Sequence, residues 1–299
     1  MSDACAHTAA MMGTVVSVQV LGHGDTADAR DERGAAIARA MRWFSQVEQA
    51  CSRFDPASEL NRLVHQVGVP VAVSELLFQA TAFAHAVAEQ SDGAFDPTVG
   101  ARMVERGYDR EYRTGRRVAA LELDDADATW RDLVLDVESR TIALRRPLQL
   151  DLGAVAKGLA IDLAAAELRP FGSFTIDAGG DLYAGGRNPD GDPWAVGIRH
   201  PREPDALVET IHVSDVAVCT SGDYERGEHL LDPCTGDAAT ALASVTVLAP
   251  SAMVADALAT AVYVLGEREG LALLERHGAE GLVVHADASC ARTAGFPRG

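Results

Sequence analysis

The sequence predicts a mixed α/β protein built as one compact unit. Segments whose apolar residues recur at helical spacing alternate along the chain with short runs rich in β-branched residues. No internal repeat of fixed period and no linker divides the 299 residues. A hydrophobic content of 47% is enough for a large core. We therefore expect a single domain that spans residues 1–299.

In the first half of the chain, local signals predict one strand and three helices. The strand begins after Met12-Gly13-Thr14, where small and apolar residues alternate. The short second helix follows an Asp-Pro turn and has Ser58 as its N-cap, and Ser74 caps the third. The predicted ranges are a strand at 15–20 and helices at 32–50, 58–63 and 74–91.

The middle of the chain predicts a hairpin followed by a helix with a cationic start. Residues 133–137 and 141–144 flank a turn, and Asp151 then ends a strand. The helix at 155–169 carries Lys157 in its first turn, between two glycines. A helix N-terminus with a lysine favours phosphate binding, although neither a P-loop nor a GxGxxG pattern is present.

The second half predicts further strands and two more helices. Gly179 and Gly180 allow a tight bend with exposed amides. The predicted strands are at 173–177, 194–198, 207–218, 244–249 and 281–285, and the helices are at 252–265 and 268–277.

The helix at 252–265 is the most informative element. Ser251 is its N-cap and Gly266 its C-terminal signal, and it is apolar nearly all round, so it should be buried. Its polar side chains, Asp256, Thr260 and Tyr263, follow i, i+4, i+7 spacing and form one stripe. A buried carboxylate of this kind either caps a nearby loop or belongs to a site for Mg²⁺ or Ca²⁺.

Upstream of that helix, the segment TSGDYERGEHLLDPCTG is a candidate chemical loop. Its start offers hydroxyls and backbone amides suited to phosphate. His229 and Asp232 precede a Pro and a Thr-Gly turn. A lone histidine is more often structural, but loops rich in Gly, Asp and Ser frequently carry chemistry.

Charge and cysteine content exclude several classes of protein. Lys plus Arg is 26 and Asp plus Glu is 44, so the formal charge is −18. This argues against a general nucleic-acid binder and against adhesion to anionic membranes. Five cysteines without a CxxC pair predict neither a zinc knuckle nor a disulfide framework. The N-terminus lacks signal-peptide features and no segment has membrane length, so we expect a cytoplasmic protein without a membrane anchor.

Seven ordered motifs together resemble the FAD:protein FMN transferases, the ApbE-type flavin transferases. The resemblance spans residues 12 to about 266. Each motif is weak alone, and their shared order makes the signal strong. The motifs are MMGT, SRFDPASELNRL, DGAFDPTVG, DLGAVAKG, IDAGGDLYAGG, TSGDYERGEHLLDPCTG and SVTVLAPSAMVADALAT.

The resemblance implies a fold, a reaction and a set of site residues. It implies a single α/β module with a T-fold-like sheet core. It implies that FMN passes from FAD to a Ser or Thr hydroxyl of a target flavoprotein in a Mg²⁺-dependent reaction that releases AMP. The metal ligands would be Asp256, Thr260 and the backbone carbonyl of Ala154, and His229 would act in proton transfer. The positions that would contact FAD are Met12, Ala94, Phe95, Asp96, Asp151 and Lys157.

This sequence departs from the family pattern at three places. Family members are often exported lipoproteins, and this chain shows no such signal. ERGYDREY stands where a tryptophan-containing turn is common, which affects the fit near the flavin ring. Cys234 stands where a basic residue is frequent, which could alter contacts to phosphate or to the target.

Three other interpretations remain open. A Mg²⁺-dependent FAD pyrophosphatase would use nearly the same residues and yield FMN and AMP, so only its products in the presence and absence of an acceptor distinguish it. A non-catalytic FAD-binding protein would not need His229, Asp256 and Thr260 together. A structural or interaction module without a ligand would not co-purify with FAD absorbance.

Overall fold

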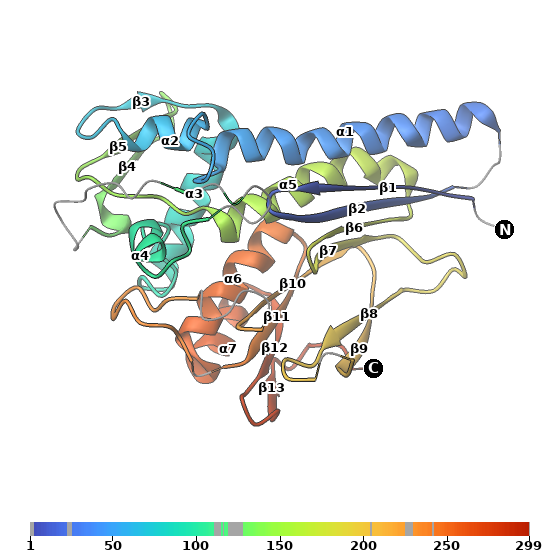
Figure 1. Cartoon of the computed structure of the whole chain (residues 1–299). Helices are drawn as coiled ribbons and strands as arrows, with labels where there is room; N and C mark the ends of the chain where they lie inside the picture. Colours follow the sequence, from blue (N-terminus) through green and yellow to red (C-terminus); the bar gives the residue numbers. More distant parts are fainter. Residues whose placement is uncertain are drawn as a thin grey trace.

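The computed structural model describes residues 3–22, 26–110, 115, 117–118, 128–203, 205–224, 230–240 and 242–298. Within these ranges, eight antiparallel strands form the main sheet in the order β1-β2-β6-β7-β10-β11-β12-β13. Helices cover one face of this sheet, and the β8–β9 hairpin lies near the other face (Figure 1). No helix in the same ranges has both the length and the hydropathy needed to cross a membrane.

The chain begins with a long hairpin and a long helix. Strands β1 (Asp3–Met11) and β2 (Thr14–Gly22) join through a turn in which Met12 and Gly13 have φ values of 49° and 71°. Helix α1 (Ala27–Cys51) starts five residues before the predicted helix, because the Thr26 side chain accepts a hydrogen bond from Ala29 N–H and caps it there.

The next elements confirm the predicted short helix, the following helix and the hairpin. Ser58 and Ser74 cap their helices as expected. Strands β3 and β4 pair with opposite edges of β5 in a separate three-stranded sheet. The elements are α2 (Glu59–Val64), β3 (Val71–Ala72), α3 (Glu75–Gln90), α4 (Gly100–Glu105), β4 (Leu133–Asp136) and β5 (Thr141–Leu144).

The second half supplies most of the main sheet and its covering helices. Its helices are α5 (Gly153–Leu168), α6 (Ala252–Leu265) and α7 (Glu267–Arg276). Its strands are β6 (Phe174–Ala178), β7 (Asp181–Gly185), β8 (Trp194–Arg199), β9 (Leu207–Val213), β10 (Val216–Gly222), β11 (Ser244–Ala249), β12 (Glu280–Val284) and β13 (Cys290–Arg292).

The single strand predicted at 207–218 is wrong, because β9 and β10 are separate strands in separate sheets. Asp215 has a φ of 55° between them and reverses the chain, although no glycine or proline marks the turn.

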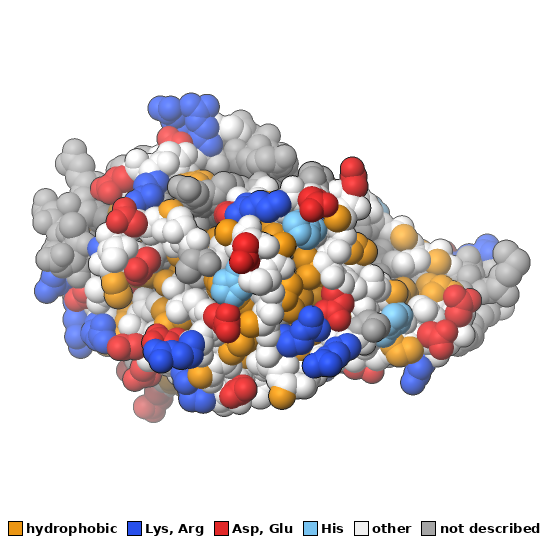
Figure 2. Space-filling model, turned by 90° about the horizontal axis from the view of Figure 1, so that it is seen from below, with side chains coloured by type: hydrophobic (Ala, Val, Ile, Leu, Met, Phe, Trp, Pro, Cys, Tyr) orange, Lys and Arg blue, Asp and Glu red, His pale blue; other side chains and the backbone are white. Residues whose placement is uncertain are grey.

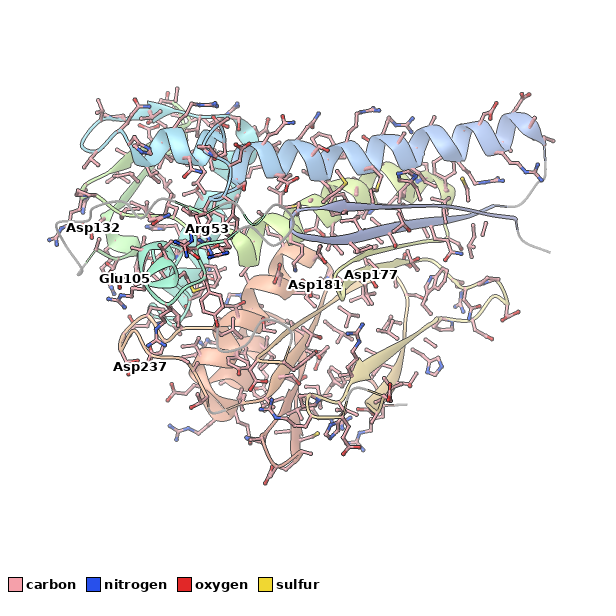
Figure 3. The ribbon with its side chains drawn as sticks, in the orientation of Figure 1. Arg53, Glu105, Asp132, Asp177, Asp181 and Asp237 are labelled. Carbon is pink, nitrogen blue, oxygen red and sulfur yellow. The ribbon has the colours of Figure 1, made fainter. Side chains whose placement is uncertain are left out.

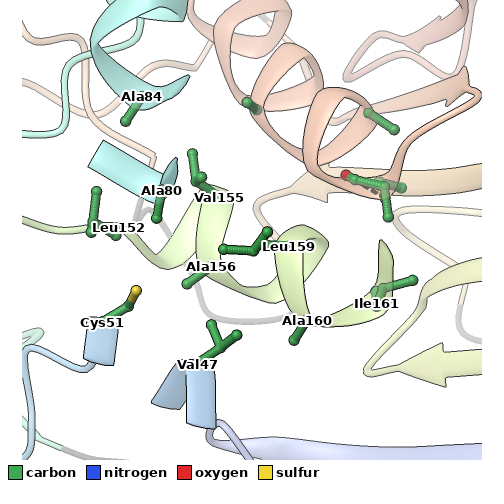
Figure 4. Packing of buried hydrophobic residues seen from close by; sticks show 14 of the residues in the cluster. Val47, Cys51, Ala80, Ala84, Leu152, Val155, Ala156, Leu159, Ala160 and Ile161 are labelled. Carbon is green, nitrogen blue, oxygen red and sulfur yellow. Dashed lines mark hydrogen bonds between the residues drawn. The ribbon is translucent and has the colours of Figure 1, made fainter. Parts of the chain in front are cut away.

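Helix α5 lies at the centre of the main core (Figure 4). Val47 and Cys51 of α1 pack on one side of it, and Ala80 and Ala84 of α3 pack on another. Helix α6 crosses α5 so closely that a Cβ added at Gly158 would lie 2.4 Å from the Met253 Cα atom. This close crossing brings the polar side chains of α5 and α6 within reach of one another.

A second, smaller core covers the opposite face of the sheet. Ile198 of β8 and Ile211 of β9 pack there against Val218 and Leu248 of the main sheet. On the face seen from below, Lys and Arg side chains are interspersed with Asp and Glu side chains and do not form one basic surface (Figure 2).

Candidate active site

Helix α6 presents Asp256 and Thr260 on one face, as the sequence predicts. Ser251 caps the helix by accepting a hydrogen bond from Val254 N–H, and Gly266, with a φ of 79°, ends it. Asp256 is buried and Thr260 is half-buried. The four-residue spacing places both oxygen-bearing side chains on the same side, toward α5 and the sheet.

Lys157 lies between two buried carboxylates. Its Nζ atom is 3.0 Å from Asp256 Oδ2 and also contacts Asp181 Oδ2. Asp181 opens β7, directly after the Gly179–Gly180 bend, and its Oδ1 accepts a hydrogen bond of 2.9 Å from Thr220 N–H of β10. The arrangement joins one cation from α5 to anions from α6 and β7, as a buried charge requires.

Strand β10 adds hydroxyl groups to the same region. Ser221 Oγ lies 3.2 Å from Thr260 Oγ1, within hydrogen-bond distance. The next inward residue on β10, Cys219, is fully buried, and burial raises the pKa of its thiol well above the usual value. Cys219 is therefore a buried residue of the main core.

Asp162 fixes α6 against α5. Its carboxylate accepts hydrogen bonds from Ser251 Oγ at 2.6 Å, Ala252 N–H at 2.7 Å and Met253 N–H at 3.0 Å. Burial raises the pKa of Asp162, and these hydrogen bonds act in the opposite direction. Because Asp162 and Lys157 share α5, this cap sets the position of Asp256 relative to Lys157.

We expect Asp162→Ala to lower the free energy of unfolding by about 2 kcal/mol, because the first turn of α6 loses its carboxylate acceptor. Chemical denaturation measures the change. The control is Asp190→Ala, at an exposed loop position, which should stay within about 0.5 kcal/mol of the unaltered protein. Equal stability of the two variants would show that the cap contributes nothing.

The donor set at this site suits a hard divalent cation. Asp256 offers a carboxylate, and Thr260 and Ser221 offer hydroxyl oxygens, which are ligands that Mg²⁺ prefers. Among the described residues, no group of three or more His, Cys, Asp and Glu side chains could hold a metal ion. A cation here would thus rely on hydroxyl and backbone oxygens besides Asp256. Ala154 lies in the first turn of α5, three residues before Lys157.

The loop that contains Ala94, Phe95 and Asp96 is buried and tightly hydrogen-bonded. Gly93, with a φ of 83°, turns the chain into it. Asp96 Oδ1 accepts hydrogen bonds from Thr98 N–H at 2.8 Å and Thr98 Oγ1 at 2.6 Å. Burial raises the pKa of Asp96, while these hydrogen bonds act to lower it. The Asp96 carboxylate thus holds its own loop together and joins it to Trp130, whose backbone N–H donates to Asp96 Oδ2 at 3.2 Å.

Asp151 connects this loop to the start of α5. Its backbone N–H donates to Pro97 O at 2.7 Å, and its carboxylate accepts from Gly153 N–H at 2.8 Å. Arg53 Nε lies 2.8 Å from Asp151 Oδ2, and Arg53 Nη2 donates to Tyr108 O. Figure 3 shows Arg53 among the segments before α4 and α5.

Two buried donors near this loop fit a polar ligand. Within the described part of the chain, Arg53 Nη1 and Trp130 Nε1 have no hydrogen-bond partner. A Cβ added at Gly93 would lie 3.4 Å from Trp130 Nε1, so the indole borders the loop. Buried unsatisfied donors are costly, and oxygen atoms of a bound ligand would satisfy them.

Two further predicted residues, Met12 and His229, lie in other segments of the chain. Met12 lies in the β1–β2 turn, and its N–H donates to Glu48 Oε1 of α1 at 3.1 Å. His229 lies outside the described residues. The segment just after it is held against α4, because Arg102 donates to Pro233 O and Arg106 forms a 2.9 Å ion pair with Asp237.

The structure adds Asp181, Ser221 and Arg53 to the predicted residues. Asp181 follows the glycine pair of IDAGGDLYAGG, and Ser221 belongs to the hydroxyl-bearing TSGDY segment. Those motifs pointed to backbone amides and phosphate, and no sequence signal indicated that Asp181 would pair with Lys157. Arg53 belongs to the SRFDP motif, whose arginine has no chemical partner nearby in the sequence.

Comparison with known proteins decides the family. Residues 12–283 match the model of the ApbE family. The chain belongs to this family.

Curated ApbE relatives cover nearly the whole chain. An FAD:protein FMN transferase of Treponema pallidum is 33% identical and covers 96% of this chain and 86% of its own length. The FAD:protein FMN transferase of Vibrio cholerae is 31% identical, with coverage of 88% and 82%. The resemblance inferred from the motifs is thereby confirmed.

Solved ApbE structures share the fold. The flavin transferase ApbE from Vibrio cholerae superposes with a TM-score of 0.82 at 27% identity, covering 98% of this chain and 97% of that one. The ApbE protein from Thermotoga maritima gives 0.83 at 28% identity, covering 98% of each chain. The predicted mixed α/β class is confirmed.

Proposed function

We propose that this ApbE family member is an FAD:protein FMN transferase that moves FMN from FAD to a Ser or Thr hydroxyl of a target protein and releases AMP. The observation that carries the proposal is the Lys157 ammonium between Asp256 and Asp181, beside the Thr260–Ser221 hydroxyl pair. The names of the curated relatives support the same activity.

The reaction exchanges the phosphoanhydride bond of FAD for a phosphate ester bond to the acceptor. The acceptor hydroxyl oxygen forms a bond to the phosphorus of the FMN half of FAD, and the bond from that phosphorus to the AMP phosphate oxygen breaks. The acceptor proton goes to a base, and AMP leaves as the anion. Such reactions depend chiefly on positioning and charge neutralisation.

The site residues divide these tasks. Asp256 and Thr260, with the Ala154 carbonyl, would hold Mg²⁺, which neutralises charge on the phosphates. Lys157 adds a cation near the start of α5, in a chain whose net charge is −18. The loops with Met12, Ala94, Phe95, Asp96 and Asp151 would bind the rest of FAD, and Arg53 and Trp130 offer it buried donors.

His229 is the proposed base for the acceptor hydroxyl, because a neutral imidazole near pH 7 can accept that proton. We expect His229→Ala to lower the single-turnover rate of FMN transfer by roughly two to four orders of magnitude and to leave the FAD dissociation constant nearly unchanged. His212→Ala, at an exposed position on β9, is the control and should keep both values.

A structural His229 would behave differently in the same measurements. Its loss would weaken FAD binding and the transfer rate together, because the HLLDPCTG segment that contains it would loosen. A variant that transfers FMN at the unaltered rate would remove His229 from the mechanism, and Asp232 would become the next candidate.

The experiment that tests the proposed function incubates the protein with FAD, Mg²⁺ and a candidate Ser- or Thr-bearing flavoprotein. Mass spectrometry should detect an acceptor heavier by one FMN residue, together with an equal amount of AMP. A matched acceptor with alanine at the modified position should gain no mass. FMN and AMP released equally with and without the acceptor would identify a hydrolase. No consumption of FAD would overturn both activities.

A further inference from the structure

The Lys157 ammonium is shared between two carboxylates that come from different elements. Asp256 lies on α6 and Asp181 opens β7, and both contact the same Nζ atom. The exposed fractions of the three side chains are 18% for Lys157, 7% for Asp181 and 9% for Asp256. At this depth each charge depends on its neighbours more than on water.

This sharing matters because Asp256 is also the carboxylate proposed to bind the divalent cation. An ammonium group and a metal ion on the same carboxylate repel each other and compete for its oxygens. If Asp256 were the only counter-charge of Lys157, metal binding would leave a buried ammonium unpaired. Lys157 thus needs a second anion for the metal-bound state.

Asp181 is held where it can be that anion. Thr220 N–H donates to its Oδ1 at 2.9 Å, which leaves Oδ2 directed at Lys157. The register of β7 on β10 pairs Leu182 with Val218, which fixes the strand that carries the carboxylate. Figure 3 shows Asp181 and Asp177 at the ends of β7 and β6, at the turn between these strands.

We propose that Asp181 is a positioning residue that retains the Lys157 ammonium and so frees Asp256 to bind the divalent cation. The inference rests on the proposed function, since it takes Asp256 as a metal ligand. Asp181 acts through Lys157, and it neither binds the metal nor touches FAD. Its effect on metal affinity should therefore disappear when Lys157 is removed.

A double-mutant cycle read out by metal binding tests this prediction without any turnover. Mn²⁺ binding to the whole protein, without FAD, is followed by electron paramagnetic resonance for the unaltered protein, Asp181→Asn, Lys157→Met and the combined variant. Asp181→Asn should weaken Mn²⁺ binding by about tenfold or more, whereas Lys157→Met and the combined variant should agree within about threefold.

The matched control is Asp177→Asn. Asp177 lies at the end of the neighbouring strand and its carboxylate accepts a hydrogen bond from Gly180 N–H at 2.9 Å, but it is exposed. Its replacement should change Mn²⁺ affinity by less than about twofold, since an exposed charge is screened by solvent. This control separates the contact with Lys157 from a general loss of negative charge.

Three results would overturn the inference. If the Asp181→Asn variant bound Mn²⁺ as tightly as the unaltered protein, Lys157 would not compete with the metal ion for Asp256. A combined variant about tenfold weaker than Lys157→Met would show that Asp181 acts on the metal directly. The combined variant contains no buried ammonium group without a counter-charge, so this comparison holds even if Asp181→Asn folds poorly. Unaltered protein that binds no Mn²⁺ would reject the metal site of the proposed function as well.

Discussion

Asp256→Ala is expected to abolish FMN transfer, a loss of at least about four orders of magnitude, because the variant lacks the carboxylate proposed to hold Mg²⁺. The fold should survive the change. Lys157 keeps its contact with Asp181, so no buried ammonium is left without a counter-charge. Single-turnover assays with FAD and an acceptor measure the first effect, and thermal melting measures the second.

Asp256→Asn is the companion variant, because it keeps the shape of the side chain and removes only the charge. It should be as inactive as Asp256→Ala, since an amide oxygen is a weak ligand for Mg²⁺ beside a lysine. Transfer by either variant within about tenfold of the unaltered rate would rule out Asp256 as an essential ligand. Full activity of the unaltered protein in excess chelator would reject the metal requirement altogether.

Gly158→Ala is expected to lower the free energy of unfolding by about 3 kcal/mol or more, because a methyl group does not fit between α5 and α6. The added Cβ would lie 2.4 Å from Met253 Cα and 2.5 Å from both Ala252 O and Met253 N. These are backbone atoms, so relief requires the two helices to separate. The same separation would pull Asp256 away from Lys157 and reduce FMN transfer.

Gly34 supplies the matched control for this prediction. It lies inside helix α1, and a Cβ added there would meet no atom within 4 Å. Gly34→Ala should be neutral or more stable by up to about 1 kcal/mol, because alanine favours a helix over glycine. Urea denaturation measures the free energy of unfolding of both variants. Equal stabilities would mean that the close crossing of α5 and α6 does not contribute to the stability of the fold.

Elements with strong local signals are predicted well from this sequence. Helix α6 begins after the Ser251 cap and ends at Gly266, as expected from its capping residues and apolar composition. The hairpin of β4 and β5 likewise follows the turn signal between two apolar runs. In both cases the determining interactions lie within a few residues along the chain, so a single sequence contains them.

Elements that depend on distant partners are missed. Strand β1 has the sequence DACAHTAAM, whose alanines give little preference for a strand, and it forms because β2 supplies its hydrogen bonds. Strand β7 is only five residues long and follows two glycines, so it resembles a loop until β6 and β10 pair with its edges. Such pairing is a tertiary property.

The sequence by itself determined that Asp256 and Thr260 share one face of a buried helix, because helical geometry relates residues four positions apart. It also determined the family, through the order of its motifs. Only the tertiary structure decided which charges meet. Lys157 pairs with a carboxylate 99 residues away, and Asp181 joins them from β7. The physical reason is that helix periodicity defines a face, whereas packing at Gly158 and strand pairing decide what that face contacts.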